Sequence, residues 1–168
     1  MKYAVIENNT VTNIAEASVP LGENWIETEN AKKGDIWDGE AFTPPAPPAP
    51  TAADVNAERD RRLPLDFEFN GKMYQRDAVS IARISGAGAL ALGAIVQGAQ
   101  PGNLLWHGRD TPFVWIASDD SLTTMDAQTC FAFGAAAAAV ETEIIFAAKA
   151  LRGLDPIPAN FADDEYWP

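Results

Sequence analysis

The stretch Thr43-Pro-Pro-Ala-Pro-Pro-Ala-Pro-Thr51 divides this chain of 168 residues into two parts of different composition. Five of its nine residues are prolines, whose rings fix φ and whose nitrogens have no hydrogen to donate to a helix or sheet. Residues 44–50 are therefore expected to form an extended polyproline II linker, about 20 Å long at roughly 3.1 Å per residue. We expect a small module over residues 1–43 and a larger one over residues 51–168.

The net charge of −12 bears on the partners of this chain. Nucleic acid and anionic membrane surfaces both require clustered Lys and Arg. The one basic cluster, Arg59 with Arg61 and Arg62, alternates with Glu58 and Asp60, which cancel most of its field. We expect no nucleic-acid partner and no membrane insertion.

Two uncharged stretches, residues 84–100 and 127–140, are shorter than the roughly 20 residues that span a bilayer. Both are rich in Ala and Gly, which favours helices packed closely inside a protein. The N-terminus reads Met1-Lys-Tyr-Ala-Val-Ile-Glu7, without the long apolar run of a signal peptide. Synthesis and folding in a cytoplasm are expected.

The first 43 residues carry the signals of a small antiparallel β module. Short β-prone runs at residues 3–7 and 10–16 flank Asn8-Asn9, and a second hairpin is expected around Asp38-Gly39. Residues 25–27 are a candidate third strand. The expected core comprises Val5, Ile14, Trp25, Ile26, Trp37 and Phe42. Such a core is small for independent stability, so this module is predicted to dock onto something else.

The region after the linker predicts an α+β fold that begins with a charged helix and a hairpin. Thr51 and Asp54 form a capping box for a helix over residues 52–63, which Pro64 ends. Residues 67–75 place Asn70-Gly71 between two alternating arms, the strongest short hairpin signal. Phe67, Phe69 and Met73 are expected on one face of this hairpin, and Tyr74 on the other.

Two long Ala/Gly-rich helices complete the predicted α+β domain. Asp77 caps residues 78–97 and Asp126 caps residues 127–152. Gly86, Gly88 and Gly93 each cost the first helix about 1 kcal/mol relative to alanine, which implies that a neighbouring backbone comes close. Residues 104–106 and 113–117 are predicted to pair as strands between the helices.

The sequence contains no recognisable catalytic, metal or cofactor motif, so an enzyme is not expected. Cys130 is the only cysteine and is predicted to be a small buried hydrophobe, and His107 is the only histidine. Asp119, Asp120 and Asp126 lack the spacing and closing Glu of a calcium loop. We expect a turn and a helix cap there.

Among the aromatic residues, Trp37, Trp106 and Trp115 are expected in cores. Trp167 lies in the acidic, aromatic run Asp-Glu-Tyr-Trp-Pro168 and has no core of its own nearby in the sequence. It is expected either to fold back on its module or to anchor on another subunit. The candidate partner contacts are Trp25, Tyr166 and Trp167.

Several motifs resemble a known family. They are Asn56-Ala-Glu-Arg-Asp-Arg-Arg-Leu63, Phe67-Glu-Phe-Asn-Gly-Lys-Met-Tyr-Gln75, Ile84-Ser-Gly-Ala, Phe113-Val-Trp-Ile and Thr124-Met-Asp126 before an Ala-rich helix. Together they resemble a domain of unknown function found in tail fibre and tail-associated proteins of tailed bacteriophages and prophages. The opening Met1-Lys-Tyr-Ala-Val-Ile-Glu-Asn8 and the proline-rich junction look like the small β module that often precedes that domain.

The resemblance implies a structural component of a phage tail tip or fibre base, present in the virion after synthesis in the bacterial host. Its partners would be other tail proteins, further copies of itself as a homotrimer, and a host-surface glycan or protein. An assembly chaperone of the tail fibre, absent from the mature particle, is the alternative. A carbohydrate-binding adhesin that uses Trp25 or Trp167 is a third hypothesis.

Overall fold

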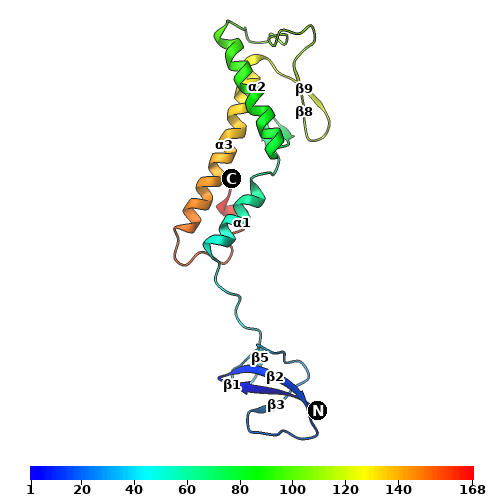
Figure 1. The fold of residues 1–168 in the computed structure, drawn as a ribbon, viewed down its shortest axis with the longest axis vertical. Coiled ribbons are helices and arrows are strands. Elements are labelled where there is room, and N and C mark those ends of the chain that lie inside the picture. Colours follow the sequence, from blue (N-terminus) through cyan, green and yellow to red (C-terminus); the bar gives the residue numbers. More distant parts are fainter. The chain divides into compact units, whose positions relative to one another are not determined.

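The computed structural model describes residues 1–168 as two compact units, Met1–Pro48 and Ala49–Pro168 (Figure 1). The first unit is an antiparallel sheet, and the second combines three α-helices with two short hairpins. The fold is α+β, as the sequence predicts.

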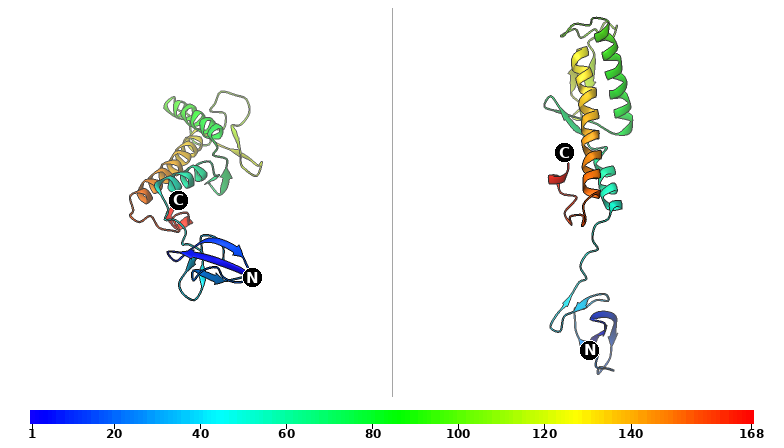
Figure 2. Two further views of the ribbon diagram at one scale, coloured as in Figure 1. Left: turned by 60° about the horizontal axis from the view of Figure 1, so that its bottom comes forward. Right: turned by 90° about the vertical axis from the view of Figure 1, so that its left-hand side faces the viewer.

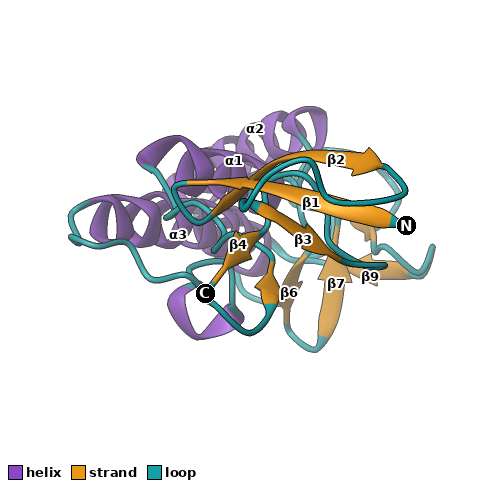
Figure 3. Ribbon diagram, turned by 90° about the horizontal axis from the view of Figure 1, so that it is seen from below, coloured by secondary structure: helices purple, strands orange, loops and turns teal.

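The N-terminal unit is a five-stranded sheet in the order β3-β1-β2-β4-β5. Its strands are β1 (Lys2–Glu7), β2 (Thr10–Glu16), β3 (Trp25–Glu27), β4 (Ile36–Trp37) and β5 (Phe42–Thr43). Strand β1 lies between β2 and β3 (Figure 3). Asn8 and Asn9 adopt φ of 49° and 61°, the left-handed conformation that a two-residue hairpin turn needs.

The core of this unit differs from the predicted one. Its buried cluster is Ala4, Val11 and Ala31, with Ile14 and Phe42 packed beside it. The prediction favoured large side chains, but this cluster centres on Ala4, and the neighbouring Tyr3, which the prediction left out, is also buried. Val5, Trp25, Ile26 and Trp37 are only partly buried. The register shift between Val5 and Ile6 also breaks the simple alternation on which the prediction rested.

The second unit is arranged around α3 (Ala127–Arg152), its longest helix. Helix α2 (Ala78–Val96) lies against the first half of α3, and α1 (Ala52–Arg62) lies against the second half (Figures 1 and 2). The predicted caps are all present, since Thr51, Asp77 and Asp126 accept backbone hydrogen bonds at the three N-termini. Local sequence therefore defined these helices correctly.

The first hairpin of this unit corrects a predicted face. Strands β6 (Phe67–Phe69) and β7 (Lys72–Tyr74) flank the Asn70-Gly71 turn, and Phe67 lies directly opposite Tyr74. Residues directly opposite each other share a face, so Tyr74 is buried with Phe67 while Met73 is exposed. The prediction had placed Met73 with Phe67 and Tyr74 on the other side.

The second hairpin pairs β8 (Val114–Ile116) with β9 (Leu122–Thr124), and the predicted pairing with residues 104–106 is wrong. Residues 104–106 form a turn that buries Trp106, whose indole N–H donates to the carbonyl of Met125 at 3.0 Å. Strand β9 was missed because its Leu-Thr-Thr sequence is short and has little apolar alternation. The predicted turn at Asp119-Asp120 joins β8 to β9.

Two apolar clusters hold the second unit together. The larger one stacks Phe67 on Phe133 at 5.4 Å between ring centroids and sets Tyr74 edge-on to Phe133 at 4.7 Å. The smaller one docks α1 and the C-terminal segment onto α3; its buried members are Val55, Ile144, Ala148, Leu151 and Trp167. Cys130 lies in the larger cluster and is fully buried, as predicted.

Candidate interaction surfaces

Two glycines, Gly88 of α2 and Gly134 of α3, face each other where these helices pack. A Cβ built on Gly88 would lie 3.6 Å from the Cα of Gly134, whereas nothing lies within 4 Å of one built on Gly86 or Gly93. The expected close neighbour is therefore present at Gly88 only. Gly86 and Gly93 lower helix stability with no compensating contact inside this chain.

A shallow apolar groove follows this crossing. It has a volume of about 220 Å³ and no charged residue in its lining; its walls include Gly88, Ala89 and Leu92 of α2 and Phe131, Gly134 and Ala135 of α3. Small residues leave the helix backbones accessible, so another helix can approach them closely.

Large apolar side chains extend beyond the groove along both helices. On α2, Leu92 is 45% and Val96 is 80% exposed, and on α3 Phe146 is 60% exposed. Phe131 and Ile145 are exposed as well. We call these five residues and the groove the α2–α3 apolar face. Exposed apolar surface of this kind marks interaction sites in water-soluble proteins.

By length and composition, α2 and α3 are also apolar enough to cross a membrane. Helix α3, however, carries Glu141, Glu143 and Lys149 in its second half. Charged side chains at such positions are costly in lipid. These features favour a protein partner for the apolar face.

The β8–β9 hairpin presents a second apolar surface. Val114, Ile116 and Leu122 are all exposed, and Ile116 lies directly opposite Leu122. Trp115, whose side chain points to the other face, packs edge-on to Phe133 at 5.3 Å. The hairpin thus anchors itself through one face and leaves the other free for a partner.

The three predicted contact residues lie in different surroundings. Trp25 is partly buried and its ring centroid lies 5.9 Å from that of Tyr3. Trp167 is 7% exposed, donates its indole N–H to the carbonyl of Phe161 at 2.8 Å, and packs in the α1–α3 cluster. Tyr166 is partly buried beside the same cluster. Of the two places expected for Trp167, the structure shows the fold-back onto its own unit.

An ionic network fastens the segment that carries Trp167. Arg62 donates to Glu58 at 2.6 Å, to the carbonyl of Ala162 at 2.7 Å and to Asp164 at 2.8 Å, and its guanidinium lies 5.2 Å from the centroid of the Trp167 ring. Hydrogen bonds from Arg61 and Arg62 lower the pKa of Glu58 to about 2, against the opposing effect of burial.

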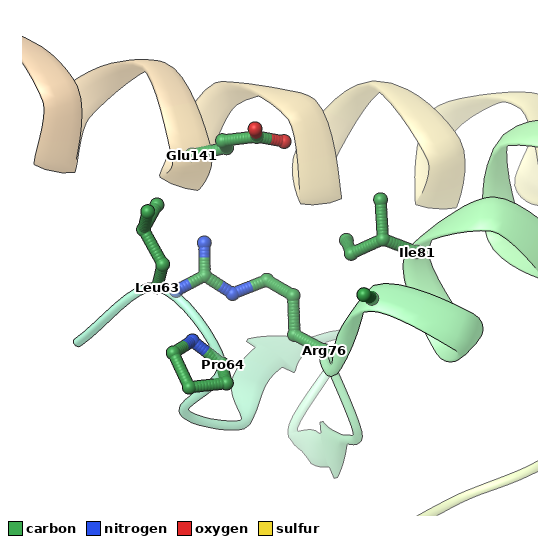
Figure 4. Close-up of a pocket in the computed structure, with 6 residues that line it drawn as sticks. Leu63, Pro64, Arg76, Ile81 and Glu141 are labelled. Atoms are coloured by element: carbon green, nitrogen blue, oxygen red, sulfur yellow. The ribbon is translucent and has the colours of Figure 1, made fainter. Parts of the chain in front are cut away.

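A pocket of about 380 Å³ lies where α1 ends and α2 begins, and Arg76 lines it with Leu63, Pro64, Ala78, Ile81 and Glu141 (Figure 4). Arg76 is 3% exposed and donates through Nε to the carbonyl of Leu65 and through Nη2 to that of Arg62, both at 3.1 Å. Its Nη1 is buried without a hydrogen-bond partner. Burial lowers the pKa of Arg76, while the charge of Glu141 opposes that shift. The sequence did not single out this arginine, because no motif surrounds it.

The residues with catalytic potential are dispersed in this structure. No group of three or more His, Cys, Asp or Glu is placed to hold a metal ion. His107 packs edge-on to Trp106 and Phe113, and burial raises the pKa of the Cys130 thiol to about 11. A thiol with so high a pKa is a poor nucleophile.

Comparison with known proteins identifies the second unit. Residues 46–165 match the family model described as a domain of unknown function (DUF4376). No match was found among curated proteins or among solved structures. The matched residues include the three helices, both hairpins and most of the C-terminal segment. The chain thus belongs to the DUF4376 family.

Proposed function

We propose that this protein is a structural component of a tailed-phage virion, associated with the tail tip or tail fibre, and that it acts through protein–protein contacts. The α2–α3 apolar face carries the proposal. Burial of exposed side chains such as Leu92, Val96 and Phe146 contributes about 1.5–3 kcal/mol each, and a partner supplies that burial.

The resemblance of the second unit to phage tail-associated domains supplies the biological setting. The DUF4376 match covers the same part of the chain but carries no function of its own. The proline-rich linker supports a role as spacer between two binding units. Other tail proteins, copies of the same chain in a threefold arrangement and a host-surface molecule are the proposed partners.

Mass spectrometry of purified particles tests the virion role. The protein should copurify with tails at a fixed ratio to the other tail proteins. Presence in infected cells but absence from particles would replace this proposal with the assembly-chaperone alternative. Binding of glycans by the free protein, lost on Trp25→Ala, would instead favour the adhesin.

A charge placed on the apolar face tests the contact surface. Leu92→Glu should remove the protein from particles and from any oligomer seen by light scattering, because it buries a carboxylate in the interface at the groove. Leu21→Glu is the matched control, since Leu21 is also exposed, at 74%, but belongs to the N-terminal unit. If Leu92→Glu assembles as well as the unchanged protein, the α2–α3 apolar face is not the contact surface.

A further inference from the structure

We propose that the Arg76 pocket binds a monocarboxylate that carries a small apolar group. The inference does not depend on a virion role. It starts from the unpaired Nη1 of Arg76, which is one of four buried side-chain polar atoms without a partner and belongs to the only charged group among them.

The position of the guanidinium is fixed by two hydrogen bonds. Nε and Nη2 are held by the carbonyls of Leu65 and Arg62, so the side chain cannot turn away to reach water without breaking both. Figure 4 shows the guanidinium between Leu63 and Ile81, with one end nitrogen directed toward the helix that carries Glu141. A guanidinium held in this way is preorganised for a planar anion, and carboxylate is the common one.

The remaining lining determines what accompanies the carboxylate. Leu63, Pro64, Ala78 and Ile81 supply apolar walls, and the volume of about 380 Å³ is that of a small-ligand site. Helix α2 begins at the pocket with Ala78, but the carboxylate of Asp77 already accepts hydrogen bonds from the backbone N–H groups of Val79 and Ser80, so Arg76 supplies the positive charge of the site. An aliphatic side chain of leucine size fits against the apolar residues, and a carboxylate attached to it meets Arg76.

Glu141 limits the charge of the ligand. It lies across the pocket from Arg76, is exposed, and makes no hydrogen bond or ion pair. Its negative charge disfavours a dianion such as phosphate, which would bring a second charge close to it. A ligand with one carboxylate pairs that group with Arg76, and the other end of the ligand is then neutral where it lies near Glu141.

NMR titration of the full chain tests the proposal with a matched ligand series. N-acetyl-leucine should shift the amide signals of Ala78 and Ile81 saturably, with a dissociation constant in the millimolar range expected for a ligand of its size. N-acetyl-leucine amide, which lacks the carboxylate, acetate, which lacks the apolar group, and phosphate should not bind comparably. Equal shifts from the acid and the amide would overturn the proposal.

Three variants leave the hydrogen bonds of Arg76 intact. Ala78→Leu fills the pocket and should abolish binding, while Ala82→Leu, an exposed change one turn further along α2, should not. Glu141→Gln should tighten binding severalfold without loss of thermal stability. If Glu141→Gln instead lowers the melting temperature and does not tighten binding, Glu141 is the natural partner of Arg76 and the pocket is closed by its own chain.

The same assay distinguishes the source of the carboxylate. A short peptide ending in a free leucine carboxylate is compared with its amidated form and with an amidated peptide that carries an internal Glu beside Leu. Binding of the free-ended peptide alone indicates a chain terminus, and binding of the Glu peptide indicates an acidic side chain. If neither peptide binds and N-acetyl-leucine does, the ligand is a free small acid.

Discussion

Glu58 is the residue on which the C-terminal attachment depends most. One carboxylate accepts from both Arg61 and Arg62, and Arg62 then reaches the segment that contains Asp164 and Trp167. Arg62 is buried, so the loss of Glu58 would leave a buried cation with fewer partners. Removing one member of such a pair is costly because the other stays desolvated.

Glu58→Gln should lower the free energy of unfolding at pH 7 by about 1–3 kcal/mol, the usual range for hydrogen bonds to charged groups. The pKa of Glu58 lies near 2 in the folded chain and 4.5 is its ordinary value, so its stabilisation is fully present above about pH 4.5. It is lost as the pH falls toward 2.

Urea unfolding at several pH values measures this effect. The difference between the unchanged protein and Glu58→Gln should shrink steadily from pH 5 to pH 2. Glu143→Gln, an exposed change with no hydrogen bond to lose, serves as the control and should leave stability and its pH dependence nearly unchanged. A constant difference across this range would show that Glu58 acts by packing alone.

At the scale of elements, α2 and α3 are helices whose glycines have unequal roles. Gly88 makes room for Gly134, but Gly86 and Gly93 face open space. The sequence pattern shows the cost of a glycine in a helix but not which side its neighbour lies on. Only the register of the two helices reveals that.

Gly86→Ala and Gly93→Ala should each raise the free energy of unfolding of the monomer by up to about 1 kcal/mol, because alanine restricts the unfolded chain and favours helix. Gly88→Leu should lower it by about 1–3 kcal/mol, because the added carbons need the space that Gly134 occupies. Chemical denaturation of dilute protein measures all three. Destabilisation by Gly86→Ala would indicate that another backbone covers that position in solution.

The elements show where sequence reasoning succeeds and where it stops. Caps at Asp77 and Asp126 and the turn at Asn70-Gly71 act locally, so they defined most boundaries. Predicting which face Tyr74 occupies requires knowing which residue lies opposite it on the neighbouring strand. Predicting strand β9 requires knowing that it pairs with β8, which its own short sequence does not indicate. The apolar composition of the α2–α3 face was visible, but its exposure depends on packing.

The Arg76 pocket illustrates the same limit for the candidate site. Its lining comes from the end of α1, the start of α2 and the middle of α3, which lie far apart in the sequence. Whether a nitrogen of Arg76 lacks a hydrogen-bond partner can be seen only once the positions of the surrounding backbone carbonyls are known. No local pattern could have found it.

At the scale of the whole molecule, each compact unit has its own core. The second unit contains both of the larger apolar clusters, and the first relies on a cluster centred on Ala4, Val11 and Ala31. The Thr51 cap belongs to the second unit and does not require the residues before the linker. The second unit should therefore be stable in the absence of the first.

A fragment of residues 49–168 should keep a cooperative thermal transition with a melting temperature within a few degrees of that of the full chain. Differential scanning calorimetry of the fragment and the full chain measures this. The fragment of residues 1–48 should unfold at lower temperature, because its buried surface is small for its length. Loss of the cooperative transition in residues 49–168 would contradict the division into two units.

The burial of Cys130 has a practical consequence. It is the only cysteine, it is fully buried in the larger cluster, and its thiol pKa is raised to about 11. A thiol reagent can therefore react only during moments when α3 separates from its neighbours. The rate at which Cys130 is labelled therefore reports how often this opening occurs. A slower labelling rate after a partner is added would show that the partner binds the helices and suppresses the opening.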